Sequence, residues 1–328
     1  MSAPEIPTES SRRSGFVSVI GRTNAGKSTF VNTAVGEKVA IVTPKPQTTR
    51  DRIRGIITRP QGQIILVDTP GIHNAKGRPE LNRRMVQSAM ATLMEVDCIV
   101  HIVDATIAAR RPEKIHPLDL EILKGIAAAK RPALLVLNKV DKLKKPALLP
   151  ILETFAPQIP EVYTHIIPAS AKDASDVNRI LDLVYRELPD GPDLYPADQI
   201  SDRTDRFLSS EIVREQVFLQ MRQELPYGTA VEIETYEEEG KRIRIGASIL
   251  VERDSHKGML IGKGGENLRK MGSAARLELN KLLGKRVHLE LYVKTDTRWT
   301  NAPEALSRLG YDRVDMAPMH FGDSDLSE

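Results

Sequence analysis

Short apolar runs alternate with longer amphipathic stretches along the first half of the chain. Apolar runs without internal polar positions are typical of strands that are buried on both faces, and helical spacing between them indicates covering helices. Their alternation predicts an α/β fold with a mostly parallel sheet covered by helices. The predicted strands are 16–20, 53–57, 63–67, 98–103, 133–137 and 165–168, with helices from Thr29 onward, at 82–94 and at 118–130.

The second half of the chain has a different period. Apolar and polar residues alternate over 242–252 and 287–293, which indicates strands with one buried face. The order helix, strand, strand, helix, helix, strand predicts an α+β domain. Its predicted elements are 205–225, 229–238, 242–252, 257–261, 266–283 and 287–293.

Residues 188–196 combine Pro, Gly and Asp in a run that neither a helix nor a sheet accommodates easily. We interpret this run as a domain boundary, with a semi-rigid and partly extended linker between two independent cores. The predicted organisation is a flexible tail 1–14, a first domain 15–188, a linker 189–203, a second domain 204–296, a C-terminal segment 297–312 and a disordered tail 313–328.

The composition of the 328 residues is that of an ordinary globular protein, with 41% hydrophobic and 28% charged residues. The net charge of +3 is compatible with a nucleic-acid partner but does not argue for one. The single cysteine, Cys98, lies in an apolar run and is expected to be buried in a reducing compartment. Residues 1–14 lack the apolar core of a signal peptide, and no apolar run is long enough to span a membrane, so we expect a cytoplasmic protein.

A glycine-rich stretch between the first strand and the first helix has the pattern of a phosphate-binding loop, G-x-x-x-x-G-K-S. Glycines let successive N–H groups surround a phosphate, Lys27 can reach the β- and γ-phosphates, and the Ser28 hydroxyl can ligate Mg²⁺. The alternative is an ordinary strand-to-helix turn. The candidate residues are Gly21, Arg22, Thr23, Asn24, Ala25, Gly26, Lys27, Ser28 and Thr29.

A second acidic element follows the strand 63–67, where the chain reads Asp68, Thr69, Pro70 and Gly71. Alone, this tetrapeptide is a plain turn signal. Downstream of a phosphate-binding loop it predicts a carboxylate that holds Mg²⁺ and a glycine amide that senses a γ-phosphate.

Two further motifs at strand ends predict which base is bound. The Asp141 carboxylate can accept two hydrogen bonds from the N1–H and N2–H₂ edge of guanine, whereas adenine has no donors there. Asn138 would fix the loop and the purine, the Lys139 stem would cover the ring, and the Ala171 N–H would reach guanine O6. The two motifs comprise Asn138, Lys139, Val140 and Asp141, then Ser170, Ala171 and Lys172.

Taken together, these motifs resemble a translation-factor-type GTPase domain, and Pro46 to Arg50 is particularly similar to the Era family. By that resemblance Thr49 is the switch threonine that ligates Mg²⁺ when GTP is bound. Thr23 and Ala25 stand where the family usually has Pro and Val, but neither side chain holds phosphate.

Ile72 occupies the position where many GTPases carry a glutamine that orients water. An apolar side chain cannot orient water, so another device is needed. Asn24 stands where related GTPases use an asparagine to ligate K⁺ beside the phosphates. Ligating K⁺ and bracing the loop both stay open for Asn24, and the candidate catalytic residues are Asn24, Lys27 and Thr49.

The second domain resembles a type II KH domain, with Gly262, Lys263, Gly264 and Gly265 as the G-x-x-G loop between its paired helices. In KH domains this loop approaches the backbone of about four nucleotides. The alternative is that the glycines only turn one helix into the next. We interpret the apolar stripe from Leu268 to Leu282 as core, and Lys257, Arg269 and Lys270 as solvated surface in preference to phosphate ligands.

The resemblance to the Era family covers residues 14–312 and implies a GTPase that hydrolyses GTP with Mg²⁺. It also implies binding to the 3′ region of small-subunit (16S) ribosomal RNA, a role in assembly of the 30S subunit, and peripheral association with the inner membrane. We expect a monomer. One alternative is an RNA-binding scaffold that does not turn over its nucleotide. Another is a GTPase of membrane transport or transfer-RNA modification, which the KH-like second half argues against.

Overall fold

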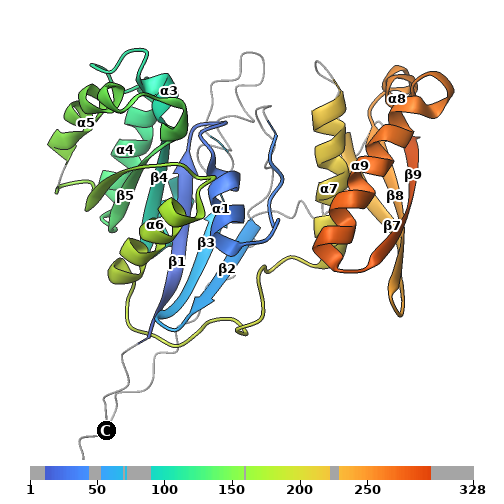
Figure 1. Ribbon diagram of the computed structural model, residues 1–328, viewed down its shortest axis with the longest axis horizontal. Helices are drawn as coiled ribbons and strands as arrows, with labels where there is room; N and C mark the ends of the chain where they lie inside the picture. Colours follow the sequence, from blue (N-terminus) through green and yellow to red (C-terminus); the bar gives the residue numbers. More distant parts are fainter. Residues whose placement is uncertain are drawn as a thin grey trace, which may run out of the picture.

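The computed structural model describes residues 12–43, 53–68, 71, 90–158, 160–221 and 229–296. Within these residues the chain forms a six-stranded sheet and a three-stranded sheet, which belong to two bodies lying side by side (Figure 1). A segment that begins after residue 188 joins them. Both predicted fold classes are confirmed.

The first sheet has the strand order β2-β3-β1-β4-β5-β6. Neighbouring strands pair in parallel except β2 and β3, which pair antiparallel because only Pro60 and Gln61 connect them. The prediction of a mostly parallel sheet is therefore confirmed, with one antiparallel edge. The strands are β1 Arg13–Gly21, β2 Ile53–Arg59, β3 Gly62–Asp68, β4 Cys98–Asp104, β5 Ala133–Asn138 and β6 His165–Ala169.

Helices cover both faces of this sheet. One core packs α1 and α6 against the sheet, and a second core packs α4 and α5 against the opposite face. Cys98 is buried in the first core, as predicted, and burial raises the pKa of its thiol to about 12. The helices of this body are α1 Lys27–Val35, α3 Ala105–Ala108, α4 Pro117–Ala129, α5 Leu149–Phe155 and α6 Ala174–Glu187.

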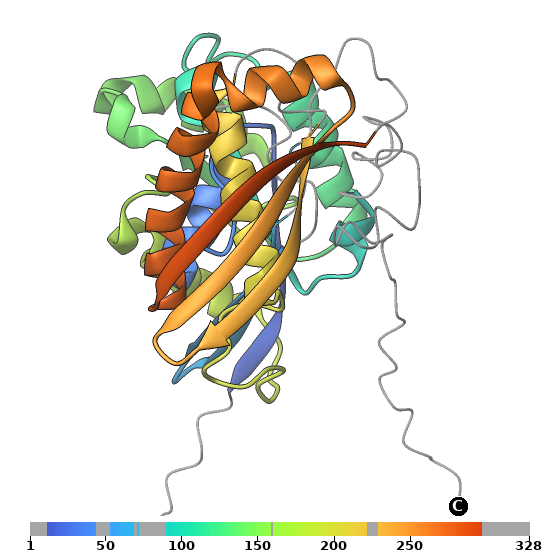
Figure 2. The same ribbon diagram turned by 90° about the vertical axis from the view of Figure 1, so that its right-hand side faces the viewer.

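The second body is a three-stranded sheet whose strands β7 and β8 pair antiparallel, while β8 and β9 pair in parallel. Helices α7 and α9 lie on the face of this sheet that is turned toward the first body (Figures 1 and 2). The alternating residues of β8, from Ile243 to Val251, lie in the core between this sheet and its helices, as predicted. The elements are α7 Asp205–Gln220, β7 Thr229–Glu239, β8 Arg242–Val251, α8 Asp254–Ile261, α9 Glu266–Leu283 and β9 Arg286–Thr295.

Several sequence predictions of element bounds are wrong, among them the end of α7 and the start of β1. The helix predicted to continue to residue 225 ends at Gln220, and Met221 is already extended at φ −90° and ψ 154°. Strand β1 begins at Arg13, inside the predicted flexible tail 1–14, because the Arg13 N–H donates to the Gln61 carbonyl at 2.9 Å. The start of β1 was not predicted because its first residues have polar side chains. The end of α7 was not predicted because periodicity alone does not mark where a helix ends.

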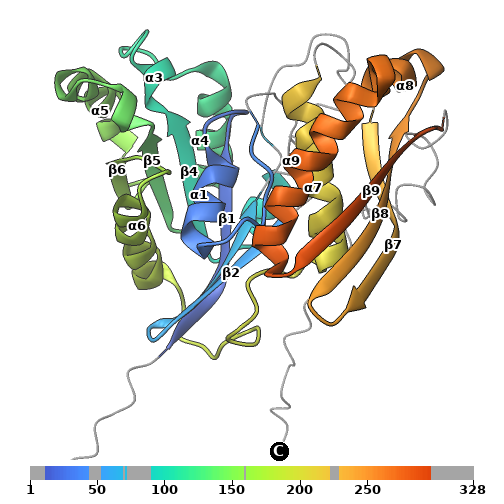
Figure 3. The same cartoon turned by 45° about the vertical axis from the view of Figure 1, so that its right-hand side comes forward.

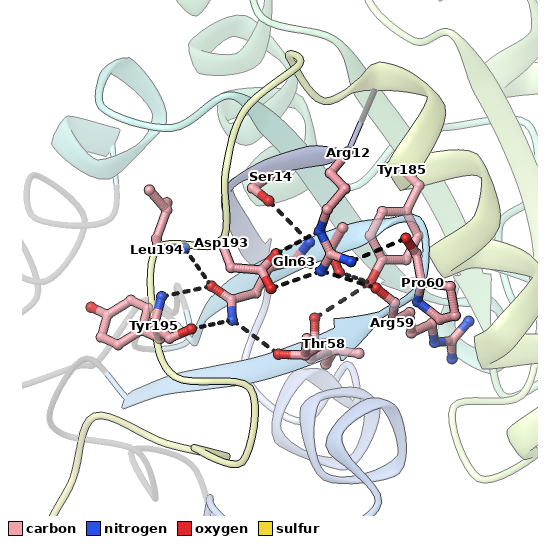
Figure 4. A network of polar contacts seen from close by, with 12 residues as sticks. Arg12, Ser14, Thr58, Arg59, Pro60, Gln63, Tyr185, Asp193, Leu194 and Tyr195 are labelled. Carbon is pink, nitrogen blue, oxygen red and sulfur yellow. Dashed lines mark hydrogen bonds and ion pairs between the residues drawn. The ribbon is translucent and has the colours of Figure 1, made fainter. Parts of the chain in front are cut away.

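The predicted linker is attached to the first sheet along much of its length (Figure 4). Arg12 pairs with both carboxylate oxygens of Asp193 at 2.7 Å. The buried Gln63 side chain accepts from the N–H groups of Leu194 and Tyr195 at 2.8 Å each and donates to the Tyr195 carbonyl at 2.9 Å. Further along, the segment covers the edge strand β2, where the Ile56 N–H donates to the Ile200 carbonyl at 2.9 Å.

The two bodies also touch directly. Glu215 of α7 is buried and accepts from the Val42 N–H at 2.9 Å, and its other oxygen pairs with Lys38 Nζ at 2.5 Å. Lys38 also lies 3.4 Å from Glu278 of α9. Figure 3 shows α7 and α9 on the side of the second body that faces α1. The hydrophobic cores of the two bodies are thus separate sets of residues, but the surfaces of the bodies are joined by partly buried polar contacts.

Candidate nucleotide and RNA sites

The loop from Gly21 to Ser28 connects β1 to α1, as the sequence predicts. At two of its glycines, neighbouring atoms leave no room for a side chain. A Cβ on Gly21 would lie 2.3 Å from the Ile102 carbonyl oxygen, and one on Gly26 would lie 2.1 Å from Asn138 Nδ2. Gly26 also has φ +108°, a conformation that side chains rarely adopt. The loop is therefore tightly enclosed by β4 and by the Asn138 side chain.

The Lys27 ammonium is held inside this loop. Nζ donates to the carbonyls of Gly21 and Arg22 at 3.1 Å each. Burial lowers the pKa of Lys27 to about 8, although the carboxylate of Asp68 acts in the opposite direction. A Cβ on Gly71 would lie 3.1 Å from Nζ and 2.9 Å from the Thr23 Cα, which places Gly71 against the loop.

Ser28 and Asp68 meet at the adjoining ends of α1 and β3. The Ser28 Oγ donates to Asp68 Oδ2 at 2.9 Å. A hydroxyl and a carboxylate are hard oxygen ligands, which suit Mg²⁺ completed by phosphate and water. No group of three or more His, Cys, Asp or Glu side chains gathers within the described ranges, so a site for a metal held by protein alone is not found there. The predicted residues Thr49, Thr69, Pro70 and Ile72 lie outside the described residues.

Asn138 at the end of β5 links three of the predicted motifs. Its Nδ2 donates to the Ala25 carbonyl at 2.7 Å, and its Oδ1 accepts from the N–H groups of Lys139 at 2.7 Å and Ala171 at 2.8 Å. The Ala171 N–H was predicted to reach guanine O6, so it would have to be shared with Asn138. Asn138 therefore acts as a structural centre of this site.

A cavity of about 50 Å³ lies between these loops. Ser170 Oγ donates to Asp141 Oδ1 at 2.8 Å and so fixes the carboxylate that is predicted to read guanine. Val140 and Asp141 lie in a short 3₁₀ turn after Lys139, whose φ is +70°. The cavity is lined by Gly26, Thr29, Asn138, Lys139, Asp141, Lys142, Ser170, Ala171 and Lys172.

Asp104 at the end of β4 has a role in this site that none of the sequence motifs indicates. Its carboxylate pairs with Lys139 Nζ at 2.6 Å, and Nζ also donates to the Asn24 carbonyl at 2.6 Å. Partial burial raises the pKa of Asp104, but hydrogen bonds from Lys139 and Thr106 outweigh it, so the pKa lies below its usual value. The available signal was the position of Asp104 at the carboxyl end of a parallel strand, where ligands of such sheets bind.

The G-x-x-G loop of the second body lies between α8 and α9, with φ between +60° and +79° at its three glycines. Lys263 and Gly264 are exposed. No atom lies within 4 Å of a Cβ placed on Gly264. Arg269 Nη2 donates to the Gly264 carbonyl at 2.6 Å, and Lys270 pairs with Glu266 at 2.7 Å, so both basic groups have protein partners.

A groove of about 400 Å³ lies beside this loop, between α9 and β9. The prediction that the apolar stripe of α9 is core is confirmed for Met271, Ala275 and Leu279, which are buried. It is incomplete for Leu268, which lines the groove as well as packing on the core. The groove is lined by Gly265, Leu268, Arg269, Gly272, Ser273, Arg276, Leu289 and Leu291.

Fold and site define a GTPase domain with a phosphate-binding loop, followed by a KH domain. Residues 16–139 match the family of 50S ribosome-binding GTPases, and residues 224–300 match the KH domain family. GTPase Era of Geobacter metallireducens is 44% identical over 301 residues, which cover 91% of this chain and 98% of that protein. GTPase Era of Nitratidesulfovibrio vulgaris is 43% identical over 305 residues, which cover 92% and 98%. The chain belongs to the Era family of GTPases.

Solved structures agree over the same length. The crystal structure of Era from Aquifex aeolicus bound to GDP and AlF₄⁻ has a TM-score of 0.83 at 36% identity and covers 92% of this chain and 100% of that one. The same values hold for Era in complex with MgGDPNP and nucleotides 1506–1542 of 16S ribosomal RNA. As a member of this family the chain is a GTPase, which argues against a scaffold without turnover. Among the residues described, no helix is long and apolar enough to cross a bilayer.

Proposed function

We propose that this GTPase binds GTP and GDP at the loops around Lys27 and Asp141, and binds the 3′ region of 16S ribosomal RNA through its KH domain. Its role is to assist assembly of the 30S subunit. The observation that carries the nucleotide half is the convergence of three separate motifs on one side chain, Asn138. The RNA half is supported by the groove beside Gly262–Gly265 and by the RNA bound in a relative whose whole chain aligns with 92% of this one.

In this proposal each residue of the nucleotide site has a distinct task. Lys27 neutralises the β- and γ-phosphates, and the loop amides surround them. Ser28, Asp68 and Thr49 would hold Mg²⁺, which would offset the charge that develops on the phosphates during transfer. Asp141 pairs with the guanine edge, and Lys139 is fixed over the base by Asp104 and the Asn24 carbonyl.

Turnover separates this proposal from a scaffold that only holds nucleotide. The full chain should release phosphate from GTP over many turnovers, and Lys27→Ala should abolish that release because the phosphates lose their main cation. Phosphate release is measured with excess GTP and Mg²⁺. A single stoichiometric burst without further turnover would favour the scaffold.

Asn24 is the proposed ligand of a K⁺ ion that offsets charge beside the phosphates, since Ile72 cannot orient water. Its left-handed backbone, at φ +61°, equally suits a residue that only braces the loop. GTP hydrolysis should then be faster in K⁺ than in Na⁺ at matched ionic strength, and Asn24→Ala should remove the difference. Equal rates in the two salts would assign Asn24 to bracing.

The KH assignment is tested by the double variant Lys263→Asp with Gly264→Asp. The two carboxylates should repel phosphates, so RNA containing the 16S 3′ sequence should bind weakly while GTP binds normally. The salt dependence should also become shallower, by a log–log slope of about 0.7 for each lost phosphate contact. Lys281→Asp with Gly284→Asp is a matched control, because it makes the same exchange at the other end of α9. Equal loss in both double variants would overturn the assignment.

We also propose, from the family resemblance, that the protein is a cytoplasmic monomer that associates peripherally with the inner membrane. The proposed second domain is 204–296, the attached segment 189–203 precedes it, and the proposed first domain ends at 188 but starts with β1 at Arg13 instead of at 15. Sedimentation velocity of the full chain tests the oligomeric state, and fractionation of cells tests the location. A sedimenting dimer, or protein absent from both the cytoplasmic and the membrane fraction, would contradict them.

A further inference from the structure

A chain of buried polar side chains runs through the core between the first sheet and α4. Asp119 of α4 is 3% exposed, and His101 of β4 and Tyr163 are 0% exposed. His101 interrupts the apolar run from Cys98 to Val103 in strand β4. Burying polar groups costs free energy unless they are paired, so such a chain calls for an explanation.

The contacts of this chain lead toward the phosphate-binding loop. Tyr163 OH and His101 Nδ1 are 2.7 Å apart, and the other ring nitrogen of His101 lies 3.9 Å from Asp119 Oδ1. That gap is too long for a hydrogen bond, and neither His101 Nε2 nor Asp119 Oδ1 has a hydrogen-bond partner within the described part of the chain. The second oxygen, Asp119 Oδ2, accepts from Arg22 Nη1 at 3.4 Å.

Arg22 is itself part of the loop. Its carbonyl oxygen accepts from Lys27 Nζ at 3.1 Å and from the Ala25 N–H at 3.3 Å. The residue whose side chain is held by Asp119 therefore holds Lys27 through its backbone. Buried ion pairs contribute little net stability when compared with apolar packing, so fixing a geometry is the stronger reason for this one.

We infer that Asp119 is a positioning residue for phosphate binding, which acts from α4 by holding Arg22 and through it the loop around Lys27. The inference rests on the proposed role of Gly21–Ser28 as the phosphate site. Asp119 touches no nucleotide in this scheme. The buried His101 lies beside Asp119 Oδ1, the oxygen that does not face Arg22, at 3.9 Å, and Tyr163 lies behind His101.

Asp119→Asn keeps the shape of the side chain and removes its charge. Affinity for both GTP and GDP should fall about tenfold, which corresponds to about 1.4 kcal/mol. Binding of guanosine, followed by saturation-transfer NMR, should not change, because the base site around Asp141 does not depend on Arg22. A merely structural defect would weaken guanosine to the same degree. Glu121→Gln, an exposed charge removal on the same helix, is the matched control and should bind all three ligands normally.

Arg22→Gln removes the other partner and is independent of any folding defect at the buried position. It should give the same selective loss, and the double variant should be no weaker than either single one, since the pair acts as a unit. Additive losses, unchanged GDP affinity in Asp119→Asn, equal loss of guanosine, or equal loss in Glu121→Gln would each overturn the inference. Lys27→Ala distinguishes a failure of the role inferred for Asp119 from a failure of the proposed phosphate site. If it binds GTP normally, the proposed phosphate site itself is wrong.

Discussion

The chain contains two glycine loops that each precede a helix, and they use glycine for different reasons. In Gly21–Ser28 the added Cβ atoms would strike the Ile102 carbonyl and the Asn138 amide at 2.3 and 2.1 Å. In Gly262–Gly265 a Cβ on Gly264 would meet no atom within 4 Å, whereas one on Gly262 would lie 2.8 Å from the Asn267 side chain. The first loop is closed by the protein and leaves space only for a ligand of fixed shape. The second leaves space for a polymer backbone that passes over it.

Gly26→Ala should have the largest effect on this comparison. The new Cβ would displace the Asn138 amide, and the alanine backbone would be strained at a φ of +108°. The loop and the base site would therefore both shift. GTP affinity, measured by calorimetry, should fall about a hundredfold.

Gly36→Ala is the control for backbone strain at the same helix, because Gly36 also has a positive φ, +85°, but no atom within 4 Å of its Cβ. It should cost about 1 kcal/mol of stability and leave GTP affinity unchanged. Normal GTP binding in Gly26→Ala would show that the first loop is as open as the second.

Asp141→Asn tests whether the closed site reads its ligand by chemistry. Losing a charge-assisted pair should cost about 1.5–3 kcal/mol of GTP binding, and the new amide can pair with xanthine. Competition between GTP and xanthosine triphosphate should therefore shift toward the latter, with RNA binding unchanged. Unaltered preference for GTP would remove Asp141 from the base site.

The sequence predicts what depends on period and on strand ends. The apolar runs were sufficient to place Asp68, Asn138 and Ser170 at the carboxyl ends of parallel strands, on one edge of the sheet. It did not predict contacts that join distant segments. Gln63 lies in an apolar strand and Asp193 in a run of breakers, and only the fold shows that both hold the segment after residue 188. His101 and Asp119 were missed for the same reason.

Glu215→Gln tests whether nucleotide binding at the first loop is coupled to RNA binding at the second. Glu215 binds the Val42 N–H and Lys38, just before the segment that carries Thr49. The bound nucleotide should therefore change the RNA affinity of the KH domain. The ratio of the RNA affinities measured with a non-hydrolysable GTP analogue and with GDP should be about threefold smaller in the variant than in the wild type.

Glu278→Gln is its control, since Glu278 contacts the same lysine at 3.4 Å but is more exposed and makes no bond to Val42. Its ratio of RNA affinities should match that of the wild type. A ratio that is unchanged in Glu215→Gln would mean that the contact joins the domains without coupling them.

Gly264→Ala should have the smallest effect, and it decides whether the open loop is open because RNA lies there. Its φ of +60° and ψ of 21° make a side chain cost about 1–2 kcal/mol of stability, without any clash. Gly284 ends α9 with nearly the same geometry, φ +60° and ψ 12°, and its Cβ position is equally open. Gly284→Ala should therefore lower the melting temperature by the same amount. RNA affinity should fall about twofold in Gly264→Ala alone, because only that Cβ stands in the path of the phosphate backbone. Equal RNA affinities in the two variants would mean that the nucleotides pass elsewhere and that glycine at 264 serves only the turn between α8 and α9.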